Sequence, residues 1–497
     1  KVVKGSLWTL AGQVAPLAVS LVTTPISIRL LGAESYGVLI LVGLLPTYFA
    51  FADLGMGLAA TKNVSQAFSN SNLERENEVI WAAVFWGLLG SFPVAILFVL
   101  FSPETSKLLN IPPNLTTEAS LSLKITSITF VITIVNTILS STQLARLRMD
   151  IVTYLNTIPR VLGLAGTPIV LYYGFGIVGV TAVLLATASI TLCGNLIVLR
   201  YFLRDFFRPC LNTNILRLMI NFGIMVAVAS VATAIIANVE KVVIPSLTSV
   251  EQLAYYSVAF TIAYMMTLFS VSMAQSLIPA FSQLQKQSDR VMLSSLYIRA
   301  IKFNLIWISP ILMILAIFGD ELIGLWAGPD FGSNGSTPFV VLLLGVGSHV
   351  IATPARAALM ASGRSDIMAK VGWAEVVPYT LVVVGSTYMY GAVGAASAWS
   401  LRSIVDSILS FVIVSRISDL GLTSFFRLRY LVFFVCALPI LSSFLFGSSN
   451  LFSILVLGSC LVLYGVLVWL YVLDKQEAGW LLKSFKKREF GLSRLKS

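Results

Sequence analysis

Three arginines stand inside long apolar stretches of the sequence, where a charged side chain is costly. They are Arg160, Arg356 and Arg402. On insertion scales a charge at the bilayer centre costs about 2.5–3.5 kcal/mol, so such a residue usually faces a partner or a water-filled cavity. An arginine guanidinium also matches a phosphate group with two parallel hydrogen bonds. The three residues therefore predict a cationic cavity that accepts an anionic headgroup.

Acidic residues at comparable depth offer a structural alternative. Arg402 and Asp406 lie four residues apart, on one helical face, and could simply neutralise each other. Asp53 and Glu375 could likewise neutralise the other two arginines between helices. The residue types alone leave both the structural and the substrate-binding interpretation open.

The remaining candidates lie mid-span or at helix ends. His349 is the only histidine, and it is either a satisfied core residue or a contact for a proton or the substrate. Arg29 and Lys241, which follows Glu240, lie at the outer helix ends and are further candidate substrate contacts. A metal site needs several clustered ligands, and the four cysteines show no paired spacing. We therefore predict no metal and no cofactor.

The elements that position these residues follow from the distribution of positive charge. Hydrophobic residues make up 57% of the 497-residue chain and charged residues only 11%, which is typical of polytopic membrane proteins. Of the 33 Lys and Arg residues, 26 fall in every second gap between apolar stretches or in the C-terminal tail. This is the pattern of the positive-inside rule. The net charge of +11 thus indicates a cytoplasmic collar facing anionic lipids, and not a nucleic-acid partner.

The apolar stretches are long enough to cross a bilayer, which takes about 20 residues. We predict an all-α polytopic membrane protein with about fourteen transmembrane helices and both termini in the cytoplasm. No gap is long enough for a folded soluble domain. The expected spans are 6–28, 36–59, 79–101, 119–140, 153–173, 176–199, 216–239, 253–278, 303–325, 338–361, 371–389, 391–415, 428–447 and 450–473.

An internal repeat divides the first twelve of these spans into two sets of six. Arg148-Met149-Asp150-Ile151 recurs as Arg364-Ser365-Asp366-Ile367, 216 positions later. Six spans return the chain to its starting side, so the two halves are parallel and suited to alternating access around a central cleft. The predicted domains are an N-terminal six-helix lobe (1–210), a C-terminal six-helix lobe (211–420), an additional helix pair (421–473) and a basic amphipathic cytoplasmic tail (474–497).

Short motifs in both halves resemble a known transporter family. Leu31-Gly-Ala-Glu-Ser-Tyr-Gly37 is followed by Asp53-Leu-Gly-Met-Gly57 and Ala60-Thr-Lys62, and Glu240-Lys241 precedes Leu247 and Tyr255-Tyr256. The chain is similar here to the Wzx-type polysaccharide and lipid-linked oligosaccharide flippases of the multidrug/oligosaccharidyl-lipid/polysaccharide (MOP) transporter superfamily. The resemblance covers essentially the whole chain, although the family usually has Asp at the position of Glu240.

This resemblance implies a transporter of polysaccharide biosynthesis, for example of O-antigen or exopolysaccharide, and not an enzyme. Its substrate would be an undecaprenyl-pyrophosphate-linked oligosaccharide, moved from the inner to the outer leaflet of the bacterial inner (cytoplasmic) membrane. The arginines would hold the pyrophosphate while the lipid tail stays among membrane lipids. Polysaccharide polymerase or export proteins are candidate protein partners. Relatives use an ion gradient or the membrane potential, so H⁺ or Na⁺ is the candidate coupling ion. Four acidic residues are candidate coupling sites: Asp53, Glu240, Glu375 and Asp406.

Two other classes of function compete with this one. A multidrug or metabolite cation antiporter of the same superfamily would need an acidic or aromatic-rich cavity, and the three arginines count against it. A polytopic membrane glycosyltransferase or polymerase would need a catalytic carboxylate or a substantial outer loop, and the outer loops are short. A scaffold role would leave the buried charges unexplained. No ATP-binding loop of the Gly-x-x-x-x-Gly-Lys type occurs in the sequence.

Overall fold

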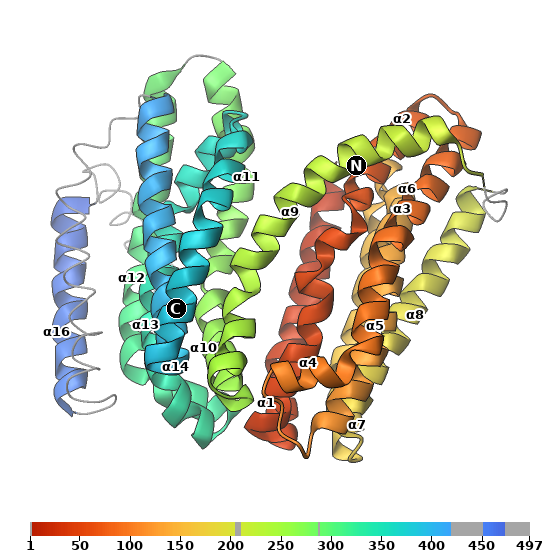
Figure 1. The fold of residues 1–497 in the computed structure, drawn as a ribbon. Helices are drawn as coiled ribbons and strands as arrows, with labels where there is room; N and C mark the ends of the chain where they lie inside the picture. The colour runs from red at the N-terminus through yellow and green to blue at the C-terminus, as the bar shows by residue number, and fades with distance from the viewer. Residues whose placement is uncertain (1, 204–209, 287–288, 419–450, 473–497) are drawn as a thin grey trace, which may run out of the picture. The chain divides into compact units, whose positions relative to one another are not determined.

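The computed structural model describes residues 2–203, 210–286, 289–418 and 451–472, and all regular structure in these ranges is helical. Nine of the described helices are long and apolar enough to cross a membrane. The number becomes ten if α10 and α11, which meet at a 42° bend, count as one span. The chain is therefore a multi-pass membrane protein of the predicted all-α class (Figure 1).

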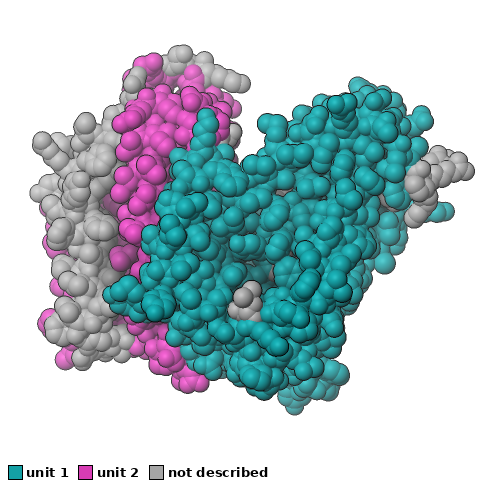
Figure 2. Space-filling model, in the orientation of Figure 1, with its two compact units in different colours: residues 1–257, 326–328, 369–395 teal, residues 258–325, 329–368, 396–497 magenta. Residues whose placement is uncertain are grey.

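The chain forms two compact units, which are coloured separately in Figure 2. Unit 1 comprises residues 1–257, 326–328 and 369–395, and unit 2 comprises 258–325, 329–368 and 396–497. The predicted lobe boundaries near 210 and 420 remain a prediction.

The helices are α1 (Val2–Tyr48), η1 (Ala50–Asp53), α2 (Met56–Ser69), α3 (Leu73–Leu100), α4 (Ser102–Leu108), α5 (Thr116–Leu139), α6 (Ser141–Ala145), α7 (Met149–Tyr172), α8 (Gly176–Phe202), α9 (Thr213–Leu247), α10 (Val250–Met265), α11 (Thr267–Lys286), α12 (Arg290–Ala327), α13 (Pro329–Ala361), α14 (Ser365–Ser418), α16 (Leu451–Leu467) and η2 (Val468–Val472).

Glycines break the two longest helices into the pairs of spans that the sequence predicts. Gly32 has φ 76° within α1 and Gly391 has φ 57° within α14, a backbone region that favours glycine. The second arm of α1 ends at Tyr48, earlier than the expected span 36–59, because η1 and the left-handed residues Leu54 and Gly55 turn the chain before α2. The expected span 428–447 and the tail 474–497 lie outside the described residues.

The repeat seen in the sequence has a matching local structure. The residues before Arg148 and Arg364 both have positive φ, 55° at Leu147 and 71° at Gly363. In each copy the arginine N–H donates to the carbonyl five residues earlier, over 2.9 and 3.3 Å. Each guanidinium also binds the aspartate two residues later, at 2.9 and 3.4 Å. The same helix-starting turn thus occurs at α7 and at α14, which supports a duplication.

Four prolines inside helices create the polar contacts between several of these helices. A proline has no N–H, so the carbonyl four residues earlier loses its helical donor. In this structure a side chain of another helix donates to each such carbonyl, as expected for prolines in membrane helices. The pairs are Trp326 Nε1 to Leu21 O at 3.1 Å (Pro25), Thr191 Oγ1 to Leu155 O at 3.3 Å (Pro159), Tyr464 OH to Ile306 O at 3.1 Å (Pro310) and Asn304 Nδ2 to Val350 O at 2.8 Å (Pro354).

Candidate functional site

In unit 2, Arg356 of α13 forms an ion pair with Asp406 of α14. Arg356 Nη1 lies 3.1 Å from Asp406 Oδ2, and Nη2 donates to the backbone carbonyl of His349 over 2.6 Å and to Thr353 Oγ1 over 3.3 Å. The side chains are 14% and 23% exposed. The arginine is therefore held on one side by a carboxylate and on the other by the backbone, and both side chains are partly exposed.

A row of serines on the second arm of α14 sets the distance between the two helices. Ser400, Ser403 and Ser407 donate to α13 carbonyls over 2.8, 2.8 and 3.1 Å. Gly345 of α13 faces Ser400, where a Cβ would lie only 2.7 Å from the Ser400 backbone. Small residues and hydroxyl groups are the usual means by which membrane helices approach closely. This spacing brings Asp406 within reach of Arg356.

Aromatic side chains form one wall of this site. Phe260 and Tyr264 of α10 stack at 5.3 Å, and both rings contact Trp399 of α14 edge-on at 5.2 and 6.4 Å. Tyr264 also lies 6.2 Å from the His349 ring and is 39% exposed. The charged groups thus adjoin an aromatic surface.

The charged groups of the site interact with one another. His349 interacts electrostatically with both Arg356 and Arg402, and Arg356 interacts with Asp406 and Arg402. Two guanidinium groups, one carboxylate and one imidazole therefore interact within this site. The structure therefore brings together four of the residues selected from the sequence, and their chemistry suits an anion better than a cation.

A second group of polar residues lies in unit 1. Glu240 of α9 is 2% exposed and accepts a hydrogen bond from Tyr379 OH of α14. Lys241 Nζ donates to Asn238 Oδ1 over 3.2 Å. Glu375 lies one turn before Tyr379 on the same helix. A buried carboxylate beside a hydroxyl group is suited to taking up a proton or a small cation.

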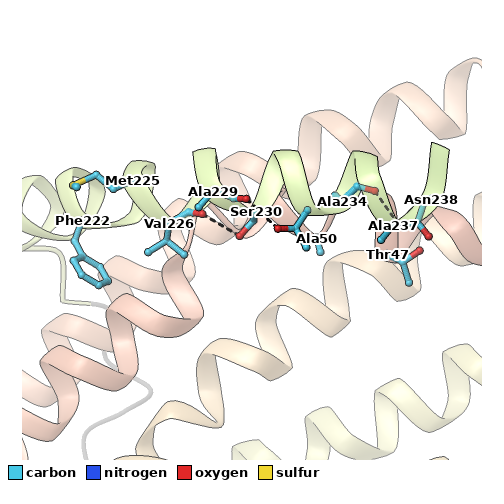
Figure 3. Close-up of a pocket in the computed structure, with 11 residues that line it drawn as sticks. Thr47, Ala50, Phe222, Met225, Val226, Ala229, Ser230, Ala234, Ala237 and Asn238 are labelled. Atoms are coloured by element: carbon cyan, nitrogen blue, oxygen red, sulfur yellow. Dashed lines mark hydrogen bonds between the residues drawn. The ribbon is translucent and has the colours of Figure 1, made fainter. Parts of the chain in front are cut away.

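A groove of about 730 Å³ runs along α9 in unit 1 and ends at Asn238 (Figure 3). Thr47 of α1 and Ala50 of η1 form its other side, and most of its lining is apolar or small. Ser230, Thr233 and Asn238 supply its polar atoms on α9. The groove therefore places an uncharged surface one helical turn from Lys241.

The other predicted residues have different surroundings. Asp53 accepts hydrogen bonds from the N–H groups of Gly55 (2.7 Å) and Gly57 (3.4 Å), so its carboxylate caps the start of α2. Arg160 is exposed on α7, and among the described residues it has no ion-pair or hydrogen-bond partner. Arg29 is exposed on α1. No cluster of three or more metal-ligating side chains occurs in the described part of the chain.

The ion pair between Arg146 and Glu76 was not predicted from the sequence. Arg146 binds the carboxylate of Glu76, which is 0% exposed, and its guanidinium lies over the rings of Phe68 and Phe202 at 4.7 and 4.8 Å. The sequence assigns Arg146 to a solvated cytoplasmic collar, whereas its side chain is paired and only 9% exposed. Its cytoplasmic position stays a prediction. Nothing in the sequence distinguishes Glu76 from its neighbours Glu74 and Glu78, since all three precede an apolar span.

Comparison with known proteins gives consistent matches. The family described as "Polysaccharide biosynthesis protein" matches residues 2–285. A Shigella flexneri protein known as "Putative O-antigen transporter" is 23% identical over 416 residues, which are 82% of this chain and 96% of that protein. The fold is similar to an inward-facing MATE-family multidrug resistance transporter of the MOP superfamily (TM-score 0.69, 14% identity, 83% of this chain and 98% of that one). It is also similar to the lipid II flippase MurJ in an inward closed conformation (TM-score 0.67, 15% identity, 94% and 99%).

Proposed function

This chain belongs to the polysaccharide biosynthesis protein family, and we propose that it is a flippase for an undecaprenyl-pyrophosphate-linked oligosaccharide, moving it from the inner to the outer leaflet of the bacterial inner membrane. The O-antigen transporter relative supports a lipid-linked glycan as substrate. Membrane lipids and this glycan are then its partners. Its family and this relative identify the chain as a membrane transporter of polysaccharide biosynthesis.

The positive site around Arg356 is the observation that carries the proposal. A pyrophosphate offers several oxygens in the geometry that a guanidinium binds best. Asp406 contacts Arg356 through one oxygen and is 23% exposed, so a phosphate oxygen can replace it without opening the core. Arg402 adds the second positive charge. The ion pair thus keeps Arg356 neutralised when the site is empty and yields to the substrate anion.

The aromatic wall suits the sugar next to the pyrophosphate. Phe260 and Tyr264 present ring faces that are partly exposed, and the apolar face of a sugar ring packs against such surfaces while its hydroxyl groups stay hydrated. A cation antiporter would instead require a negative site. The likeness to MATE transporters is one of fold, and the charge of the site favours the flippase over the antiporter.

Ion coupling is best supported at Glu240. Its carboxylate is buried, and Tyr379 donates to it from a different helix. Binding of H⁺ or Na⁺ there changes the charge of the α9–α14 contact, which is the kind of local event that biases a conformational equilibrium. Glu375 and Asp406 remain further candidates. Asp53 is the least supported of the four, since two backbone N–H groups already engage its carboxylate.

The charge alternation supports a topology with both termini in the cytoplasm and alternating access by the two predicted six-helix lobes. Single cysteines at Arg75 and Arg364 test it in a background that lacks the four native cysteines. Membrane-impermeant maleimide should leave both positions unlabelled in intact cells and should label a cysteine at Lys107. Labelling at Arg75 or Arg364 would refute this orientation.

Deletion of the gene tests the proposed function. In a strain without redundant exporters, lipid-linked oligosaccharide should accumulate on the inner leaflet and surface polysaccharide should fall. Wild-type protein and an Arg364→Ala control should restore export, and Arg356→Ala should not, at equal membrane levels. Normal surface polysaccharide in the deletion strain would rule the function out.

A further inference from the structure

Within unit 2, the hydroxyl group of Tyr464 on α16 contacts the backbone of α12. Tyr464 is 5% exposed, and its hydroxyl lies 3.1 Å from the carbonyl oxygens of both Leu305 and Ile306 on α12. Apolar side chains surround it, among them Leu457 and Cys460 of α16 and Met313 of α12. A hydroxyl group in such surroundings is costly unless it is hydrogen-bonded.

Pro310 explains why this hydrogen bond exists. In a regular helix the carbonyl of Ile306 would accept from the N–H of residue 310, and proline has none. The carbonyl of Leu305 is different, because Ser309 Oγ already donates to it over 2.8 Å. Ile306 is therefore the acceptor that depends on Tyr464. The hydroxyl of α16 takes the place of the N–H that α12 lacks.

The same stretch of α12 reaches the Arg356 site on its other side. Asn304 is 0% exposed and donates to the carbonyl of Val350 over 2.8 Å. That carbonyl is the one freed by Pro354 in α13. The adjacent carbonyl, that of His349, accepts a hydrogen bond from Arg356 Nη2 over 2.6 Å. Residues 304–306 of α12 thus contact both carbonyls that lack a helical donor, that of Ile306 and that of Val350. The second carbonyl lies next to the one that binds Arg356.

We propose that Tyr464 is a positioning residue for anion binding: it fixes residues 304–306 of α12, and Asn304 in turn fixes the bend of α13 from which Arg356 reaches its partners. The appended helix α16 is then part of the support of the substrate site. The effect on substrate rests on the proposed function, whereas the hydrogen bond to the proline bend does not.

A double-mutant cycle on the purified full-length protein tests the hydrogen bond. Tyr464→Phe should lower the thermal unfolding midpoint in the wild-type background. In a Pro310→Ala background residue 310 regains an N–H for Ile306, so Tyr464→Phe should have little further effect. In a Pro354→Ala control background the loss should persist, because Pro310 still leaves the Ile306 carbonyl without a helical donor. Equal losses in all three backgrounds would overturn the assignment.

Transport in proteoliposomes tests the positioning role. With lipid-linked oligosaccharide as the probe, Tyr464→Phe should raise the half-saturating concentration on the order of fivefold, the worth of one hydrogen bond, and leave the maximal rate nearly unchanged. Tyr388→Phe, at a site 80% exposed, should change neither. An unchanged half-saturating concentration in Tyr464→Phe would reduce α16 to a stabilising role and refute the positioning. Absence of transport by the wild type would refute the proposed function and leave the stability result standing.

Discussion

An arginine–carboxylate pair in unit 1 and another in unit 2 are built differently. Arg146 and Glu76 in unit 1 make two contacts, one of them 2.9 Å, and the guanidinium also lies over two aromatic rings. Arg356 and Asp406 in unit 2 make one contact, and both side chains are partly exposed. The first pair uses both carboxylate oxygens and is sealed from solvent. The second keeps hydrogen-bonding capacity for another anion.

Their positions in the sequence suggest the opposite. Arg146 falls in a gap that the charge pattern assigns to the cytoplasm, whereas Arg356 falls inside an expected span. Depth in the membrane therefore does not decide how completely an arginine is neutralised. The number of contacts and the remaining exposure decide whether the pair only stabilises the fold or can also exchange partners.

The largest effect is expected from breaking the sealed pair. Glu76→Gln leaves the Arg146 guanidinium buried without its counter-charge, which should cost about 3–5 kcal/mol of stability. Unfolding of the purified protein measures this cost. Replacing both residues by apolar ones, Glu76→Leu with Arg146→Met, should recover most of it. A loss below about 1 kcal/mol for Glu76→Gln would mean that the pair is hydrated after all.

A smaller effect on stability and a large one on transport are expected at the open pair. Arg356→Ala removes a charge-assisted hydrogen bond to the substrate, worth about 1.5–3 kcal/mol, so transport at low substrate concentration should fall at least about tenfold. The initial rate in proteoliposomes is the measurement. Arg416→Ala, at an exposed position at the end of α14, is the control. Undiminished transport would show that Arg356 serves only the fold.

Asp406→Asn should act in the opposite direction on binding. It removes the carboxylate that competes with the substrate phosphate and makes the charge of the site more positive by one unit. The half-saturating concentration should fall by a few-fold, and the maximal rate should fall too, because release of the anion becomes slower. Weaker binding in this variant would contradict the idea that Asp406 yields to the substrate.

The smallest effect is expected at the exposed pair of the repeat. The Arg148 guanidinium donates a hydrogen bond to Asp150 and holds the pKa of that carboxyl below its usual value of 3.8. A depressed pKa in the folded state contributes stability above the unfolded pKa, and this contribution is lost as the pH falls through the folded pKa. Asp150→Asn should thus lower the unfolding midpoint slightly at pH 7. The difference should vanish in acid and shrink in high salt, and a difference that persists in acid would refute the ionic origin.

The span pattern and the candidate arginines could be predicted because they depend on local properties of the chain. Apolar length predicts the spans, and the segments that begin at Arg148 and Arg364 mark corresponding points of the two repeats. The partner of Asp406 could not be predicted, since Arg402 on the same helix fits an i,i+4 pair as well as Arg356 fits a contact between helices. Tyr379 and Glu240 lie 139 residues apart, and no local signal joins them.

The prolines show the same limit from another side. Pro310 and Pro354 predict, from the sequence alone, that the carbonyls of Ile306 and Val350 lack their helical N–H donors. The sequence does not say which side chain replaces the missing N–H, because that depends on how helices pack. Asp53 is a further case: its motif is visible, but its role as a cap follows only from the left-handed turn at Leu54 and Gly55.

Binding of undecaprenyl pyrophosphate, compared with undecaprenol, tests the central claim most directly. The two ligands share the lipid tail and differ only in the anion, so the ratio of their dissociation constants for the purified protein isolates the positive site. We predict that the wild type prefers the pyrophosphate and that Arg356→Ala combined with Arg402→Ala abolishes the preference while tail binding remains. Equal affinity of the wild type for both ligands, or an unchanged preference in the double variant, would contradict the account.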